Sequence, residues 1–138
     1  MSEPKKILVI DDEQDSIDIT EEILSGIGEL LFLSANNGLK GLEIAKDSKP
    51  DLIILDLLMP LMHGFQVFKE LKKDKITMNI PVIILTGISD KQGLSYNSKD
   101  MGIILGEEPD VYIDKPIDPE EFIKTVSKLL NIRPKTYD

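Results

Sequence analysis

The feature that most constrains the fold is a run of four apolar residues that ends at a carboxylate. The run spans residues 52–55, Asp56 stops it, and the breakers Pro60 and Gly64 follow. A short continuous apolar run with such flanks indicates a central strand that is buried on both faces. Asp56 would then lie where the strand gives way to a loop, at the edge where open parallel sheets bind ligands.

Strand-like and helix-like segments alternate along the rest of the chain. Further strands are predicted at 5–10, 30–35, 81–85 and 111–114, and the last has the alternating pattern of an edge strand. Helices are predicted at 14–27, 38–47, 64–74 and 118–131, with a weaker pattern at 90–101. Asp118 and Pro119 are typical of the start of a helix. The helix at 38–47 is expected to turn Leu39, Leu42, Ile44 and Ala45 inward.

This alternation predicts an α/β fold with a parallel sheet, helices on both faces and right-handed crossovers. For five strands we expect the order 2-1-3-4-5, which is the flavodoxin-like (βα)5 three-layer sandwich. Residues 1–138 are expected to form one domain, with a core at about 4–131 and a polar tail at 132–138.

Composition excludes several classes of function. The formal net charge is −9 and there is no run of Lys or Arg, which argues against direct binding to nucleic acid or to an anionic membrane. The chain has no Cys and a single His, His63, so neither thiolate nor histidine metal sites can form. No segment has the length of a signal peptide core or a transmembrane helix, and a cytoplasmic location is expected.

Chemically useful side chains terminate four of the predicted strands. Strand 1 ends on Asp11 and Asp12, strand 3 on Asp56, strand 4 on Thr86 and strand 5 on Lys115. In the order 2-1-3-4-5 these strands are neighbours, so the side chains should share one face. Three carboxylates at close range repel each other, and Mg²⁺ with oxygen ligands would relieve that repulsion.

The same constellation suits phosphoryl transfer to a carboxylate. Asp56 would be the nucleophile, while Mg²⁺ and Lys115 neutralise the phosphoryl oxygens and the hydroxyl of Thr86 bonds one of them. Taken singly, these residues have plainer interpretations. Asp11 and Asp12 could be an N-cap and a solvated acid before a helix, and Tyr112 could be a core residue.

Four motifs in order resemble the response-regulator receiver domain of two-component signalling, the CheY-like superfamily, over about residues 4–131. They are LVIDDE at 8–13, D-x-x-M-P-x-x-x-G at 56–64, Thr86-Gly87, and Tyr112-x-x-Lys115-Pro116. The resemblance implies that Asp56 is the phosphoacceptor and that Lys115 contacts the phosphoryl group. It also implies that Thr86 and Tyr112 form a switch, and that Mg²⁺ is held by Asp11, Asp12, Asp56 and the backbone carbonyl of Leu58.

The chain departs from the family pattern in three places. His63 occupies a position that is often acidic, and we interpret it as a loop residue rather than a second phosphoacceptor. Leu58 is apolar where the family often has a polar residue. The segment 87–110 is longer than is typical, and its apolar run 103–105 either packs inward or forms a partner surface.

The leading hypothesis is a phosphoacceptor module that receives its phosphoryl group from a histidine kinase or phosphotransfer protein. It would be no enzyme beyond its own phosphorylation and dephosphorylation. Because the last predicted helix ends near residue 131, we expect output through a downstream protein partner, a relay, or a homodimer on the strand 4–helix 5 face. The alternatives are a phosphorylation-independent receiver-like binding module, a flavodoxin-type electron carrier and a metal-dependent phosphatase.

Overall fold

Five parallel strands and four helices alternate along the described part of the chain. The structure is a computed structural model, and it describes residues 4–56, 64–86, 111–114 and 117–132. The elements are β1 (Lys5–Ile10), α1 (Gln14–Leu24), β2 (Leu30–Ala35), α2 (Gly38–Ser48), β3 (Leu52–Asp56), α3 (Gly64–Lys73), β4 (Val82–Thr86), β5 (Val111–Asp114) and α6 (Pro119–Leu130). The strand order is β2-β1-β3-β4-β5, which confirms the predicted fold class.

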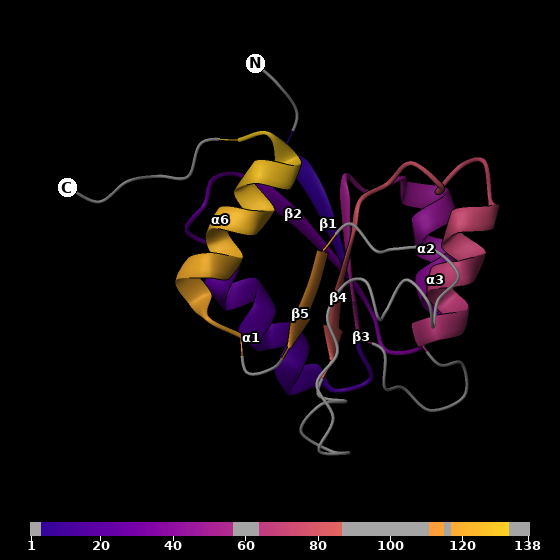
Figure 1. The fold of residues 1–138 in the computed structure, drawn as a ribbon, viewed down its shortest axis with the longest axis horizontal. Helices are drawn as coiled ribbons and strands as arrows, with labels where there is room; N and C mark the ends of the chain where they lie inside the picture. The colour runs from indigo at the N-terminus through magenta and orange to yellow at the C-terminus, as the bar shows by residue number, and fades with distance from the viewer. Residues whose placement is uncertain (1–3, 57–63, 87–110, 115–116, 133–138) are drawn as a thin grey trace.

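Helices cover both faces of the sheet. Figure 1 shows α1 and α6 on one side and α2 with α3 on the other. Each pair closes a separate core: Phe68 and Leu71 of α3 belong to one cluster, Phe122 and Val126 of α6 to the other. The result is the expected three-layer arrangement, with the sheet as the middle layer.

Strand β3 lies at the centre of the sheet, as its sequence predicts. All five of its residues are buried. Ile53 contributes to the cluster under α2 and α3, whereas Ile54 contributes to the cluster under α1 and α6. A strand between two apolar layers has no face on which a polar side chain is tolerated, so Asp56 can occur only at its end.

Local signals set where the later helices begin. The side chain of Asp118 accepts a hydrogen bond from the backbone N–H of Glu120 at 3.2 Å, and Pro119 occupies the first helical position. This confirms the predicted start of α6. The Asn37 side chain caps α2 in the same way, by accepting from the N–H of Lys40 at 2.9 Å.

Two details differ from the expectations. Helix α1 ends at Leu24 rather than at 27, because Ser25 caps it while Ile27 leaves the helix and is still buried. Leu39 is 64 % exposed and does not face the core. It belongs to the first turn of α2, at the rim of the sheet, and the inner positions there are taken by Gly38 and Gly41.

Several expectations fall outside the described residues. These are the helix at 90–101, the apolar run 103–105 and the tail beyond residue 132. Among the described helices, none combines the length and the apolar character needed to cross a membrane.

Candidate functional site

The candidate site lies at the carboxyl ends of β1 and β3. These strands are neighbours, and their register places Ile10 opposite Leu55. Asp11 follows Ile10 directly, and Asp56 follows Leu55. The parallel pairing therefore brings both carboxylates to the same level of the sheet, as the strand order predicts.

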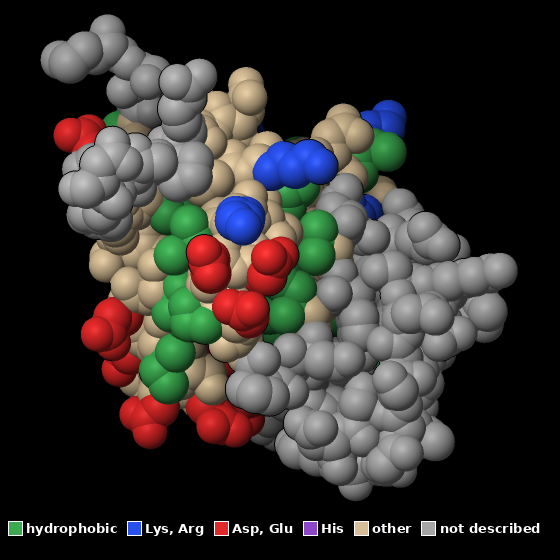
Figure 2. Space-filling view, turned by 60° about the vertical axis from the view of Figure 1, so that its left-hand side comes forward, with side chains coloured by type: hydrophobic (Ala, Val, Ile, Leu, Met, Phe, Trp, Pro, Cys, Tyr) green, Lys and Arg blue, Asp and Glu red, His purple; other side chains and the backbone are tan. Residues whose placement is uncertain are grey.

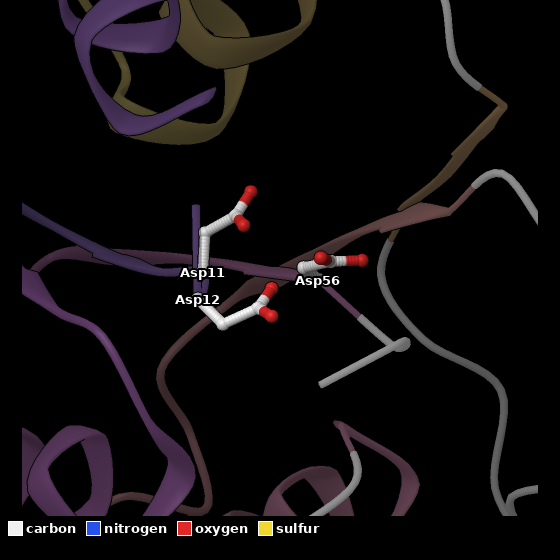
Figure 3. Close-up of side chains that lie close together, drawn as sticks. All are labelled: Asp11, Asp12 and Asp56. Carbon is white, nitrogen blue, oxygen red and sulfur yellow. The ribbon is translucent and has the colours of Figure 1, made fainter. Parts of the chain in front are cut away.

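Three carboxylates converge there. Asp11, Asp12 and Asp56 each offer an oxygen, and these oxygens all lie within 4.8 Å of one another. Figure 3 shows Asp11 and Asp12 at the end of β1 with their carboxylates turned toward the side where Asp56 lies. Asp11 is only 3 % exposed and Asp56 only 6 %, whereas Asp12 is half-buried. The cluster thus has two buried members and one that borders solvent.

Backbone hydrogen bonds fix Asp11 in place. Its N–H donates to the carbonyl of Ala35 at 3.1 Å, which extends the β1–β2 pairing by one residue. Its Oδ1 accepts from the N–H of Glu13 at 3.0 Å, an Asx-type turn that leads into α1. The sequence analysis did not predict this second bond, although an Asp three residues before the start of a helix is the pattern from which it could have been found.

The chemistry of the cluster follows from charge and ligand type. Carboxylates this close repel one another in a partly buried site, and a divalent cation relieves that repulsion. All three candidate ligands are oxygen donors, which suits the hard cation Mg²⁺, and the half-buried Asp12 leaves room for retained water. The arrangement can therefore hold a small divalent cation beside the carboxylate of Asp56.

The remaining predicted site residues are described in part or not at all. Thr86 is the last residue of β4, where it pairs with Asp114, and Leu85 pairs with Asp56. The backbone of Thr86 therefore lies at the same sheet edge as the cluster. Tyr112 belongs to β5, opposite Ile84. The side chains of Thr86 and Tyr112, and the whole of Leu58, His63 and Lys115, lie outside the described residues.

Comparison with known proteins identifies the family. The sequence model of the response regulator receiver domain matches residues 7–127. The chain belongs to the response regulator receiver domain family. These domains are signalling modules of two-component systems, and the expected resemblance is confirmed.

Individual relatives differ in how much of their length the chain covers. Protein PilH of Pseudomonas aeruginosa is 34 % identical over 125 residues, which is 91 % of this chain and 97 % of PilH. The probable transcriptional regulator ycf27 of Porphyridium aerugineum is 39 % identical over 126 residues, again 91 % of this chain. The receiver chain spans about half the length of ycf27, because the match covers 48 % of that relative.

A solved structure with a bound metal shares the fold. The receiver domain of the sensor histidine kinase PA1611 from Pseudomonas aeruginosa superposes with a TM-score of 0.77 and 20 % identity. The match covers 94 % of this chain and 99 % of that domain. That receiver domain was crystallised with a magnesium ion coordinated in its active site cleft. At this identity the likeness establishes the common fold.

Proposed function

We propose that this chain is a phosphoacceptor module that takes a phosphoryl group onto Asp56 with the help of Mg²⁺. The observation that carries the proposal is the convergence of Asp11, Asp12 and Asp56, with their oxygens within 4.8 Å, at the carboxyl edge of the sheet. Membership of the receiver family supports the same function. The donor would be a histidine kinase or a histidine phosphotransfer protein.

Asp56 acts as the nucleophile. One of its carboxylate oxygens attacks the phosphorus of a phosphohistidine; the P–N bond breaks, and the imidazole nitrogen leaves and takes up a proton. The product is an acyl phosphate on Asp56, which water later hydrolyses to inorganic phosphate and the free carboxylate. Because the carboxylate is already ionised, the protein has mainly to position the groups and balance their charge.

Asp11 and Asp12 act as metal ligands in this proposal. With Asp56 and the backbone carbonyl of Leu58 they would hold Mg²⁺, which when bound offsets the negative charge of the phosphoryl oxygens. The hydrogen bond from Glu13 to Asp11 keeps one ligand in a fixed orientation before the metal arrives. The magnesium in the PA1611 receiver domain, which has the same fold, supports the choice of metal.

Three further residues complete the proposed site. Lys115 contacts the phosphoryl group and supplies a fixed positive charge. Thr86 donates its hydroxyl to a phosphoryl oxygen, and Tyr112 turns inward as it does so. The new charge on Asp56 would bias this pair between two arrangements, so that a protein-binding surface changes.

We also propose the setting of the module. Residues 1–138 form a single receiver domain that works in the cytoplasm, and its output passes to a downstream protein. Self-association on the face formed by β4 and α6 is a second route for that output. The long segment 87–110 lies beside Thr86 in the sequence, which makes it a candidate part of the output surface.

Labelling with a small phosphodonor tests the assignment of Asp56. The chain is incubated with acetyl phosphate or phosphoramidate and Mg²⁺, and its intact mass is measured. We expect one phosphoryl group on the wild type, none on Asp56→Asn, and none on the wild type after chelation of the metal. Asp47→Asn, an exposed acid on α2, is the matched control and should label normally.

Equal labelling of wild type and Asp56→Asn would show that another residue is the acceptor. A chain that does not label and gives no Mg²⁺-dependent response to beryllofluoride would instead be a phosphorylation-independent binding module.

A further inference from the structure

The loop between α3 and β4 displays apolar side chains on the surface. Five large apolar side chains of the described residues are exposed, and two of them, Ile76 at 51 % and Met78 at 44 %, belong to this loop. The other three occur singly on α1, β2 and α2. Isolated exposed apolar residues are ordinary, whereas two within three residues of one short loop form a concentrated feature.

Hydrogen bonds hold the loop in one conformation. Thr77, between the two apolar residues, is 1 % exposed, and its hydroxyl donates to the carbonyl of Leu71 at 2.6 Å. The Asp74 carboxylate accepts from the N–H of Ile76 at 2.8 Å, and the Asp74 carbonyl accepts from the N–H of Met78 at 2.8 Å. With Thr77 anchored inward, Ile76 and Met78 are presented to solvent on a rigid support.

Lysines lie close in the sequence to the two apolar residues. Residues 69–78 contain four lysines and two acids, in a chain whose formal net charge is −9. Lys46 of α2 joins them, because its Nζ lies 3.4 Å from a carboxylate oxygen of Asp74. Lys73, the last residue of α3, and Lys75, in the loop, are exposed, and the Nζ of Lys73 lies 3.8 Å from a carboxylate oxygen of Glu70. We call Lys46, Lys73, Lys75, Ile76 and Met78 the loop patch.

Contacts of Lys72 connect the end of α3 to the end of the loop. The Nζ of Lys72 donates to the carbonyls of Met78 and Ile80 at 3.4 and 3.3 Å, and it lies 5.7 Å from the centre of the Phe68 ring. Lys72 therefore ties the end of α3 to the far side of the loop. This bracing lowers the conformational entropy that the loop would lose on binding a partner.

The loop patch and the carboxylate cluster lie at opposite ends of the sheet. In a parallel sheet every helix-to-strand loop meets the amino ends of the strands, while Asp11 and Asp56 lie at the carboxyl ends. Figure 1 shows the α3–β4 loop at the end of the sheet where the chain begins, away from the carboxyl ends of β3 and β4. A partner on the patch would leave the carboxylate cluster open to a phosphodonor.

We propose that the loop patch is a docking site for an acidic segment of a partner protein that carries apolar side chains. The apolar side chains of the segment would cover Ile76 and Met78, and its carboxylates would face Lys73 and Lys75. Burial of the two apolar side chains supplies most of the affinity, because exposed ion pairs contribute little. The lysines select an acidic partner and speed its approach.

Charge also separates this partner from an anionic membrane. Screening beyond about 10 Å limits both partners to nearby charges, but a membrane contacts a wider surface than a peptide does. The formal net charge of the chain is −9, and Figure 2 shows acidic side chains gathered on the side that carries α1 and α6, whereas a short segment contacts the loop patch alone. The docking site is thus matched to a short acidic segment.

Selection from random peptides tests the proposal. The full chain is immobilised at low salt and exposed to a displayed library of random peptides, and the selected peptides are synthesised and titrated by fluorescence anisotropy. We expect net negative peptides with apolar residues, whose affinity falls about tenfold for Ile76→Ser or Met78→Ser. Lys73→Glu should also weaken binding, and added salt should weaken binding to the wild type.

Matched controls locate the site. Leu39→Ser removes a more exposed apolar side chain from α2, and Lys124→Glu reverses an exposed lysine on α6. Both should bind the peptides as the wild type does. Asp56→Asn should also bind normally, which separates this docking site from the proposed phosphorylation. Thermal melts of each variant confirm that the fold is retained.

Three results would overturn the proposal. The first is selection of peptides that are basic or uncharged. The second is unchanged affinity in folded Ile76→Ser, Met78→Ser and Lys73→Glu. The third is absence of peptide binding together with retention of the chain on phosphatidylglycerol vesicles that is lost in Ile76→Ser, which would assign the patch to a membrane.

Discussion

Asp74 illustrates how one side chain can stabilise a whole loop. The hydrogen bond from the N–H of Ile76, together with the neighbouring ammonium of Lys46, holds the pKa of the Asp74 carboxyl below its ordinary value of 3.8, although partial burial opposes this. The ionised form is therefore favoured by the folded protein. The stability that such a carboxyl contributes is complete above the pKa that the same group has in the unfolded chain. It is lost as the pH falls through the lower pKa that the group has in the folded protein.

We predict that Asp74→Asn is less stable than the wild type at about pH 7 and that the difference shrinks toward about pH 3. The amide keeps a weaker acceptor for Ile76 and loses the attraction to Lys46. Urea unfolding at a series of pH values measures the difference. Asp47→Asn, which makes the same charge change on the exposed face of α2, should give a difference that varies less with pH. A stability difference between the wild type and Asp74→Asn that grows as the pH falls would contradict the lowered pKa of Asp74.

At the scale of the elements, α2 packs closely against β1 at a glycine, Gly41. A Cβ built on Gly41 would lie 2.6 Å from Cδ1 and 2.9 Å from Cγ1 of Ile10. Ile10 is fully buried and directly precedes Asp11, so it has little freedom to move aside. The close approach of helix and strand therefore requires a residue without a side chain.

We predict that Gly41→Ala destabilises the protein by about 1–2 kcal/mol, measured by urea unfolding. Alanine gains about 1 kcal/mol in helix propensity, but overpacking of a buried site costs about 1–3 kcal/mol, and three contacts with one branched side chain place this site at the upper end. Gly28→Ala is the matched control, because a Cβ there meets nothing within 4 Å. Equal stability of Gly41→Ala and the wild type would mean that Ile10 can repack.

The sequence predicts the strands more closely than the helix ends. Four strands are mainly apolar runs with polar residues or Pro at their ends, and the fifth alternates, so the strand limits are marked in the sequence. β1, β2 and β5 begin and end where predicted. The end of α1 depends on tertiary packing, because Ile27 fits the helical period and yet is buried from a turn. Leu39 fits the period of α2 but lies in its first turn, where none of the described elements covers it.

The candidate site, too, could be predicted from the sequence only in part. That Asp11 and Asp56 share an edge follows from strand order, which the alternation of elements predicts. That their oxygens and an oxygen of Asp12 lie within 4.8 Å depends on the register of β1 with β3 and on side-chain rotamers. Neither can be read from a one-dimensional pattern, and the same holds for the bond from Glu13 that orients Asp11.

At the scale of the whole molecule, the topology places the carboxylate cluster and the lysines of the loop patch at opposite ends of the sheet. Asp11, Asp12 and Asp56 lie at the carboxyl ends of strands, whereas the end of α3 and the loop that leads into β4 carry Lys72, Lys73 and Lys75. On the side seen in Figure 2, acidic side chains gather mostly toward the carboxyl ends of the strands and lysines lie nearer the amino ends. Such asymmetry orients charged partners as they approach.

The same asymmetry concentrates repulsion at the carboxylate cluster, so a divalent cation should stabilise the whole fold. A ligand that binds only the folded state adds about 2.7 kcal/mol at a hundredfold excess over its dissociation constant. We predict that Mg²⁺ raises the melting temperature of the wild type and that Asp12→Asn loses most of this response, because one of three carboxylate ligands is gone. Without Mg²⁺, Asp12→Asn should be the more stable protein, since it relieves the repulsion.

Glu22→Gln is the control that distinguishes the loss of a metal ligand from a mere change in net charge. It removes one negative charge from the exposed face of α1, away from the cluster, so it should keep the full response to Mg²⁺. Calorimetric melts across a Mg²⁺ series measure all three proteins. If Asp12→Asn responded as strongly as the wild type, the cation would be acting elsewhere or through general screening. Because the readout is stability, it tests the metal site independently of phosphorylation.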